Sequence, residues 1–199
     1  MVEAASLPLP YPEAAVIEAD TLPEQTFAIA AELPDRPLVL GGCCCAHVGA
    51  VEALAASHDR VCVVWFDAHG DLNTVESSPS GNEWATPLRM LIELEAVAPD
   101  DVLHVGGRKL DPPELEFMAE SGIASGAAGV YVAFDADVVD PPELDVFMPE
   151  PDGLRLEEAE SLFRQLAERA PILGLGFSGL RYSERNVEPL ARLAGTLGL

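Results

Sequence analysis

Short runs of consecutive apolar residues alternate along the chain with stretches in which apolar residues recur every three or four positions. Near-continuous hydrophobicity over a few residues is typical of strands that are covered on both faces, as in a parallel sheet. This pattern predicts strands at 14–19, 37–40, 60–66, 101–106, 129–138 and 171–177. The stretches between them predict helices at 22–33, 46–57, 86–95, 113–121, 156–169 and 186–197.

The segment 156–169 shows the helical pattern most clearly. Its apolar residues fall on one stripe, which consists of Leu156, Ala159, Leu162, Phe163 and Leu166. Such a stripe is the face that a helix packs against a sheet. Because strands and helices alternate without a linker or a change in composition, we expect residues 1–199 to form a single α/β domain. The expected architecture is a three-layer α/β/α sandwich with a mainly parallel sheet.

Acidic residues and a histidine follow two of the predicted strands. Asp67, His69 and Asp71 come directly after the strand at 60–66, while Asp135 and Asp137 end the apolar run that begins at residue 129. In extended backbone, residues two positions apart project to the same side, so these side chains can converge. Ligands of such folds bind beyond the carboxyl ends of the strands. The pattern therefore predicts a metal-binding cluster at strand ends.

Four carboxylates and one imidazole make a hard, oxygen-rich site that suits a pair of divalent ions such as manganese. Burying that much negative charge without cations would be very costly. A single aspartate at a strand end is more often a helix cap or a turn former. Two separate alternations of this kind, each closing a predicted buried strand, favour metal binding over capping.

The charge balance excludes two classes of partner. The chain has 34 acidic and 11 basic residues, which gives a formal net charge of −23. Such a surface repels phosphates and anionic lipid, so we expect neither nucleic acid nor a membrane as a partner. The apolar runs fall far short of the roughly 20 residues of a membrane-spanning helix. No secretory signal is evident, and we therefore expect a cytoplasmic protein.

The cysteines are Cys43, Cys44, Cys45 and Cys62. Neighbouring side chains on an extended segment point in opposite directions, and no secretory context is visible, so a disulfide framework is not expected. Buried thiols and a metal ligand are the two alternatives.

Three segments of the chain resemble the signatures of a known family. They are 65-WFDAHGDLNT-74, SPSGN at 78–82, and FDADVVDP at 134–141, with weaker matches at 39–45, 103–114 and 171–180. In this order they are similar to segments of the arginase, agmatinase and formiminoglutamase family of ureohydrolases. The resemblance covers nearly the whole chain from about residue 20 onward. It implies that the single domain has an arginase-like fold.

The resemblance implies a pair of Mn²⁺ ions bridged by a hydroxide, which attacks a guanidinium carbon and releases urea and an amine. On that basis Asp67 and Asp135 would bridge the ions, and His69 and Asp137 would complete one of them. Asp71 would serve the other ion and bond the hydroxide as the catalytic carboxylate. The implied substrate is a small polar guanidino or amidino compound, and a homo-oligomer is compatible with the family.

The resemblance also implies a set of residues that hold the far end of the substrate, namely Asn73, Ser80, Asn82, Asp111 and Glu114. Each has an alternative structural explanation. Asn, Ser and Asp are common turn formers, and Glu114 opens a predicted helix whose dipole favours acidic residues.

Cys44 stands where the family usually has a metal-binding histidine. A thiolate there would soften the site and shift its preference toward Zn²⁺ or Fe²⁺. For Cys44, a ligand and a small buried residue remain open alternatives. For His47, three residues later, they are a ligand, a group that supports a ligand, and an ordinary core or surface residue.

Trp84 stands in place of the family's proton-shuttling histidine, and Gly179 in place of a glutamate that grips the guanidinium. An indole cannot exchange a proton near neutral pH, although Glu184 or Glu188 could compensate for Gly179. The favoured hypothesis is a metal-dependent hydrolase of a C–N bond in a small guanidino or amidino compound. The alternative is an impaired homologue that binds metal or a small ligand without turnover. The third hypothesis is a structural or interaction protein that merely kept the fold.

Overall fold

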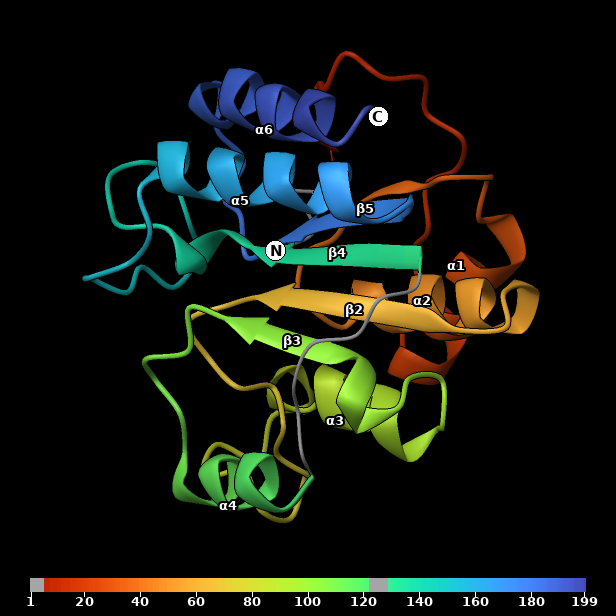
Figure 1. Ribbon diagram of the computed structural model, residues 1–199, viewed down its shortest axis with the longest axis vertical. Coiled ribbons are helices and arrows are strands. Elements are labelled where there is room, and N and C mark those ends of the chain that lie inside the picture. The colour runs from red at the N-terminus through yellow and green to blue at the C-terminus, as the bar shows by residue number, and fades with distance from the viewer. Residues whose placement is uncertain (1–5, 122–128) are drawn as a thin grey trace.

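The computed structural model describes residues 6–121 and 129–199, whose strands form one five-stranded sheet between layers of helices (Figure 1). The strands are β1 (Leu38–Leu40), β2 (Val61–Phe66), β3 (Val102–Val105), β4 (Gly129–Asp135) and β5 (Ile172–Ser178). Their order across the sheet is β1-β5-β4-β2-β3, and all neighbouring pairs are parallel.

Six α-helices lie in the described residues, close to where the apolar periodicity predicts them. They are α1 (Leu22–Glu32), α2 (Ala46–Ser57), α3 (Pro87–Glu93), α4 (Pro112–Ser121), α5 (Leu156–Arg169) and α6 (Glu184–Thr196). Short 3-10 turns occur at η2 (Glu83–Ala85), η3 (Pro99–Asp101) and η4 (Ala136–Val138). None of the helices in the described ranges has the length and apolar character needed to cross a membrane.

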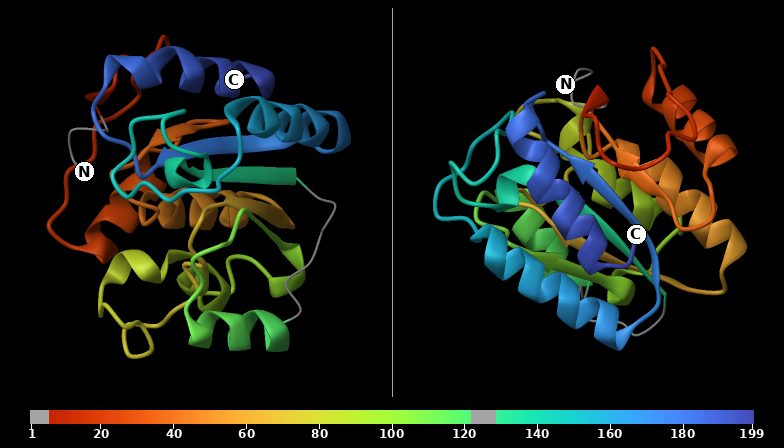
Figure 2. Two further views of the ribbon diagram at one scale, coloured as in Figure 1. Left: turned by 90° about the vertical axis from the view of Figure 1, so that its left-hand side faces the viewer. Right: turned by 90° about the horizontal axis from the view of Figure 1, so that it is seen from above.

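The helices cover the two faces of the sheet in separate layers. Figure 2 shows α5 and α6 on one side of the sheet, with α2 on the other and α1 packed outside α2. In β2, Cys62, Val64 and Phe66 pack with the layer of α5 and α6, whereas Val63 and Trp65 pack with the layer of α2 and α3. Because both faces are buried, the strand is an unbroken apolar run. The predicted three-layer α/β/α fold is confirmed.

The predicted strand at 14–19 is wrong. This segment has no regular structure, and the Val16 side chain is 64% exposed. Its two central apolar residues are flanked by Glu13, Glu18 and Asp20, so the segment carries too little apolar surface to be buried on both faces. It instead leads into α1, whose N-cap is Thr21.

The register of the central strands determines which residues meet at the carboxyl end of the sheet. Phe66 of β2 pairs with Phe134 of β4, and Asp135 of β4 pairs with Ser178 of β5. Asp67, which follows Phe66, is therefore brought beside Asp135. Three strands that are far apart in sequence deliver polar side chains to one row.

Arg108 ties together the loops that follow β3 and β4. Its guanidinium donates five hydrogen bonds, all to backbone carbonyl oxygens, whose donor–acceptor distances are 2.7–3.3 Å; the acceptors belong to Gly106, Asp137, Val138, Glu150 and Pro151. Since a planar guanidinium presents five N–H groups, this set uses its donor capacity fully. The loop carrying Asp137 is fixed by this contact.

We predict that Arg108→Ala lowers the free energy of unfolding by about 3 kcal/mol, because several carbonyl groups lose a charged donor. Arg155→Ala is the matched control, since its side chain is 71% exposed and pairs with Glu143 at the surface. The control should cost less than about 1 kcal/mol. Urea denaturation of both variants measures the difference, and equal losses would contradict the structural role of Arg108.

Candidate metal centre

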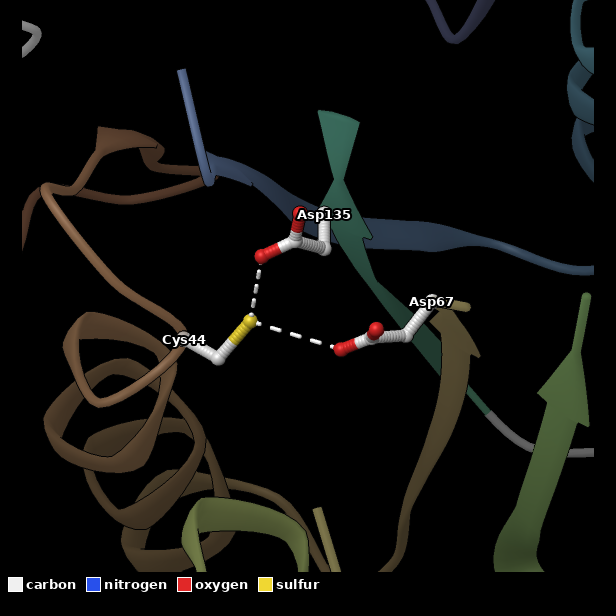
Figure 3. A group of neighbouring side chains, drawn as sticks. All are labelled: Cys44, Asp67 and Asp135. Carbon is white, nitrogen blue, oxygen red and sulfur yellow. Dashed lines mark hydrogen bonds between the residues drawn. The ribbon is translucent and has the colours of Figure 1, made fainter. Parts of the chain in front are cut away.

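Cys44, Asp67 and Asp135 converge at the carboxyl end of the sheet, as Figure 3 shows. Asp67 and Asp135 lie at the ends of β2 and β4, and Cys44 lies just before α2. The Cys44 Sγ atom is 2.9 Å from Asp135 Oδ2 and 3.6 Å from Asp67 Oδ2. All three side chains are buried, so the thiol faces two carboxylates in a site largely removed from water.

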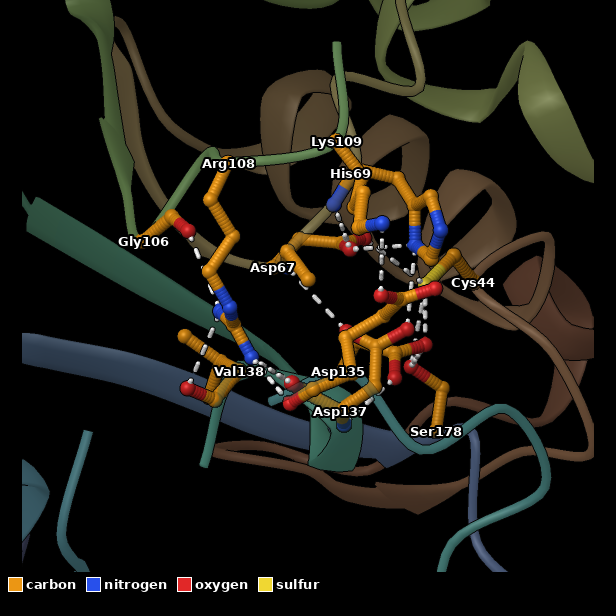
Figure 4. Close-up of polar contacts among 12 residues, drawn as sticks. Cys44, Asp67, His69, Gly106, Arg108, Lys109, Asp135, Asp137, Val138 and Ser178 are labelled. Carbon is orange, nitrogen blue, oxygen red and sulfur yellow. Dashed lines mark hydrogen bonds and ion pairs between the residues drawn. The ribbon is translucent and has the colours of Figure 1, made fainter. Parts of the chain in front are cut away.

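Asp67 also belongs to a second group, with His69 and Asp137 (Figure 4). The His69 Nδ1 atom is 3.0 Å from Asp137 Oδ2 and 3.5 Å from Asp67 Oδ1. In each group the potential ligand atoms all lie within 4.8 Å of one another. The two groups share Asp67, which places them side by side.

Asp71 lies against this cluster in an unusual backbone conformation. Its φ is 53°, in the left-handed region, and its side chain is buried. Burial, followed by the nearby charges of Asp67 and Asp135, raises the pKa of Asp71 well above its ordinary value. Its Oδ2 atom has no hydrogen-bond partner among the described residues.

A buried carboxylate oxygen without a partner is costly unless a cation or a proton occupies the space beside it. The donor set consists of four carboxylates, one imidazole and one thiol, and it fits a divalent metal better than any other common group. The residues present are therefore compatible with the metal that their chemistry implies.

Several supporting hydrogen bonds could not be read from the sequence. Trp65 Nε1 donates to Asp67 Oδ2 at 3.2 Å, and the amide of Ala68 donates to Asp137 Oδ1 at 3.1 Å. His104 Nε2 lies 2.7 Å from the carbonyl oxygen of His69. Burial lowers the pKa of His104, which favours the neutral ring as the donor. Each bond holds a candidate ligand in place, and the apolar pattern alone gives no signal of these pairings.

His47, an open question in the sequence, is fully buried, and its two ring nitrogens lie at hydrogen-bond distance from Tyr131 and Ser178. It belongs to neither of the two ligand groups. Cys44 is both buried and positioned among carboxylates, so its two sequence-based interpretations are compatible with each other.

The residues proposed for substrate binding fall into two places. Asn73 Nδ2 donates to Asp111 Oδ2 at 3.0 Å, and Glu114 accepts hydrogen bonds from the amides of Leu72 and Asp111. These residues brace the loop that carries Asp71.

Ser80 and Asn82 take no part in that brace. Ser80 is exposed, with its hydroxyl 3.0 Å from Ser78 Oγ. Asn82 lines a cleft of about 400 Å³ together with Cys43, Cys45 and Trp84. The five residues that the sequence suggested for substrate binding therefore comprise one hydrogen-bonded polar group and two residues of an accessible loop.

Gly179 has a φ of 67°, and a Cβ atom there would overlap the Asp135 carboxylate. A glutamate cannot occupy this position without a shift of backbone or ligand. Glu184 and Glu188 are both exposed on α6, and Glu188 forms an ion pair with Arg192 at 3.2 Å. Neither glutamate belongs to the two groups of potential metal ligands.

The fold and the site define an open parallel α/β protein with a candidate two-part metal centre at its strand ends. The model of the Arginase family matches residues 4–128, and the chain belongs to the arginase family. The resemblance inferred from the sequence segments is thereby confirmed.

Among its relatives, the arginase of Bacillus subtilis (strain 168) is 31% identical, with 71% of this chain and 60% of that protein covered. The chain thus spans about 60% of the length of that relative. The crystal structure of arginase from Bacillus cereus is 28% identical, has a TM-score of 0.77, and covers 88% of this chain and 75% of that one. Formimidoylglutamase from Bacillus subtilis shares the fold, with a TM-score of 0.76 at 16% identity and coverage of 93% of this chain and 68% of that one.

In the metal-free protein, burial and neighbouring charged groups raise the pKa values of Asp135 and His69. Burial and then the charge of Asp137 raise the pKa of Asp135 to about 6. Hydrogen bonds to Asp137 and then Asp67 raise the pKa of His69 to about 11. A raised pKa means that folding favours the protonated form, so both contributions to stability decrease as pH rises, for Asp135 through about 6 and for His69 toward about 11.

We predict that the metal-free protein loses about 3 kcal/mol, or roughly 10 °C in Tm, between pH 4 and 7 through Asp135. Asp135→Asn should remove this contribution and should raise the Tm at pH 7 without metal, while the contribution of Asp71, whose pKa is also raised, remains. Thermal melts in chelator at a series of pH values measure both effects. An unchanged slope in Asp135→Asn would show that other groups are responsible.

Proposed function

We propose that this chain is a metal-dependent hydrolase that cleaves a C–N bond in a small guanidino or amidino compound. Membership of the arginase family supports the reaction class. The observation that carries the proposal is that Asp67 belongs to both ligand groups. A carboxylate shared between two groups is the arrangement that two-metal hydrolytic sites use.

The residues would divide between two ions. Asp67 and Asp135 would bridge them, His69 and Asp137 would complete one, and Asp71 with Cys44 would complete the other. We propose Mn²⁺ for the pair, with Zn²⁺ or Fe²⁺ favoured where Cys44 binds. When bound, such a pair supplies a water that is deprotonated near neutral pH, and positive charge that stabilises charge developing at the attacked carbon.

Asp71 is the proposed catalytic carboxylate. Its Oδ2 atom has no hydrogen-bond partner in the described chain, so it is free to accept a hydrogen bond from the attacking water and hold its proton. The backbone of Asp71 is fixed by a hydrogen bond from the Arg89 amide to its carbonyl oxygen, at 2.9 Å. The loop on its other side is held by Glu114 through the Leu72 amide.

The acidic charge of the cleft would attract a cationic substrate. Asp20 and Glu83 line the cleft with Asn82, and the half-exposed Trp84 offers an aromatic face to a cation. We propose that Ser80 and Asn82 contact the far end of the substrate directly. Asn73, Asp111 and Glu114 would complete that end, and also keep the loop in shape. All described strands belong to one sheet, which supports residues 1–199 as one arginase-like domain.

A second candidate function is supported by Trp84 and Gly179. Trp84 cannot shuttle a proton, and the position of Gly179 excludes a larger side chain beside Asp135. On this hypothesis the protein binds metal or a small guanidino ligand without turnover. Ligand-induced thermal stabilisation in the absence of product would favour it, whereas multiple turnovers would exclude it.

We predict release of urea, ammonia or formamide from a panel of guanidino and amidino compounds that depends on added Mn²⁺. Asp67→Ala and Asp135→Ala should each reduce the rate by about a hundredfold or more, because each removes a proposed bridging ligand. Colorimetric assays of the products measure the rates.

Asp35→Ala is the matched control for these variants. Asp35 is exposed and precedes β1, so it lies at the amino end of the parallel sheet, away from the cluster. The rate of the Asp35→Ala variant should equal that of the wild type. Absence of turnover by the fully metal-loaded wild type would contradict the hydrolase proposal.

We predict that Cys44→Ser weakens zinc binding by about tenfold or more and manganese binding by much less, since a thiolate favours the softer ion. Competition with a chromophoric chelator gives both dissociation constants. Cys62→Ser is the control, because Cys62 is an equally buried thiol on the opposite face of β2. Equal effects on the two metals would show that Cys44 is not a ligand.

A further inference from the structure

His47 forms the centre of a buried hydrogen-bonded chain beneath the candidate metal centre. Its side chain is fully buried in the first turn of α2. Its Nδ1 atom is 3.1 Å from the Tyr131 hydroxyl, and its Nε2 atom is 3.1 Å from Ser178 Oγ. Ser178 Oγ is in turn 3.2 Å from Asp135 Oδ2 and 3.1 Å from Cys44 Sγ. The chain therefore ends on two proposed ligand atoms.

The absence of a side chain at Gly176 leaves space for the His47 ring. A Cβ atom at Gly176 of β5 would overlap both the His47 ring and the Tyr131 hydroxyl. The ring also stands edge-on to Trp65, with centroids 5.4 Å apart and an interplanar angle of 84°. His47 is thus fixed on several sides and cannot rotate away from Ser178.

The protons of the chain have one consistent arrangement. A ligand carboxylate only accepts hydrogen bonds, so the single Ser178 proton faces Asp135 Oδ2, with Cys44 Sγ at a similar distance. Ser178 Oγ must then accept from His47, which places the proton of the neutral ring on Nε2. The unprotonated Nδ1 accepts from Tyr131, whose phenol keeps its proton because burial raises its pKa.

We propose that His47 is a positioning residue for the metal centre: its Nε2–H occupies a lone pair of Ser178 and so directs the Ser178 proton toward Asp135 Oδ2, beside Cys44 Sγ. This inference rests on the proposed metal centre. A hydrogen bond donated to a ligand fixes its orientation and moderates its charge, and loss of such a bond typically weakens metal binding about 10- to 100-fold.

Cobalt(II) titration tests the proposal, because the visible spectrum reports ligand geometry and the near-ultraviolet thiolate band reports Cys44. His47→Phe keeps an aromatic ring against Trp65 but removes the donor to Ser178. We expect it to weaken cobalt binding about 10- to 100-fold and to change both spectral regions. His47→Gln can still donate to Ser178 through its amide, and it should retain most of the affinity and the wild-type spectrum. His58→Phe, at the other end of the same helix, should behave as the wild type.

The outcomes separate this inference from the proposed function. If the wild type binds no cobalt, the metal centre itself is wrong. If the wild type binds and His47→Phe has the same affinity and spectrum, the positioning role is wrong and the metal centre stands.

A measurement on the metal-free wild type needs no variant to fold. Nitrogen-15 NMR of the imidazole should show the Nε2–H tautomer for His47, and it should persist when metal is added. Observation of the Nδ1–H tautomer would overturn the proposal, because Ser178 would then have to give its proton to His47.

Discussion

The pairing of β2 with β4 is the constraint on which the rest of this structure depends. In-register pairing of Phe66 with Phe134 brings Asp67 and Asp135 side by side in a buried site, where like charges repel strongly. Hydrogen-bond donors around the two carboxylates partly offset this repulsion. Trp65, Cys44 and backbone amides all direct hydrogens at the carboxylates. A bound cation would neutralise the remaining negative charge of the carboxylates.

Aromatic packing on one face of the sheet fixes the strand ends that carry the polar groups. The face covered by α5 and α6 is a cluster of aromatic rings formed by Phe66, Phe134, Phe163 and Phe177, with centroids 5.3–5.8 Å apart. The residues that follow three of these rings in the chain are Asp67, Asp135 and Ser178. Because a packed core resists displacement, the rings fix the positions of the polar groups that come next.

Local pattern was sufficient to predict the layers, five of the six proposed strands and the convergence of Asp67 with His69 and Asp137, since these depend on side-chain alternation over a few positions. It failed at 14–19, where a short apolar segment resembles a strand but carries too little apolar surface to be buried on both faces. It could not assign His47, since that role depends on Gly176 and Ser178, which are more than 100 residues away. Contacts across such separations leave no local trace in a single sequence.

Cys44, Ser178 and Gly179 all lie against the carboxylate of Asp135. One of its oxygens faces Cys44 and Ser178, and the space beside the other exists only because Gly179 has no side chain. Introducing a glutamate at Gly179 would therefore displace the Asp135 carboxylate that Cys44 contacts. The group built from His69 and Asp137 has a different support, because Arg108 donates a hydrogen bond to the backbone carbonyl oxygen of Asp137. The two parts of the candidate centre are thus held differently, one by contacts around Asp135 and the other by the loop that Arg108 fixes.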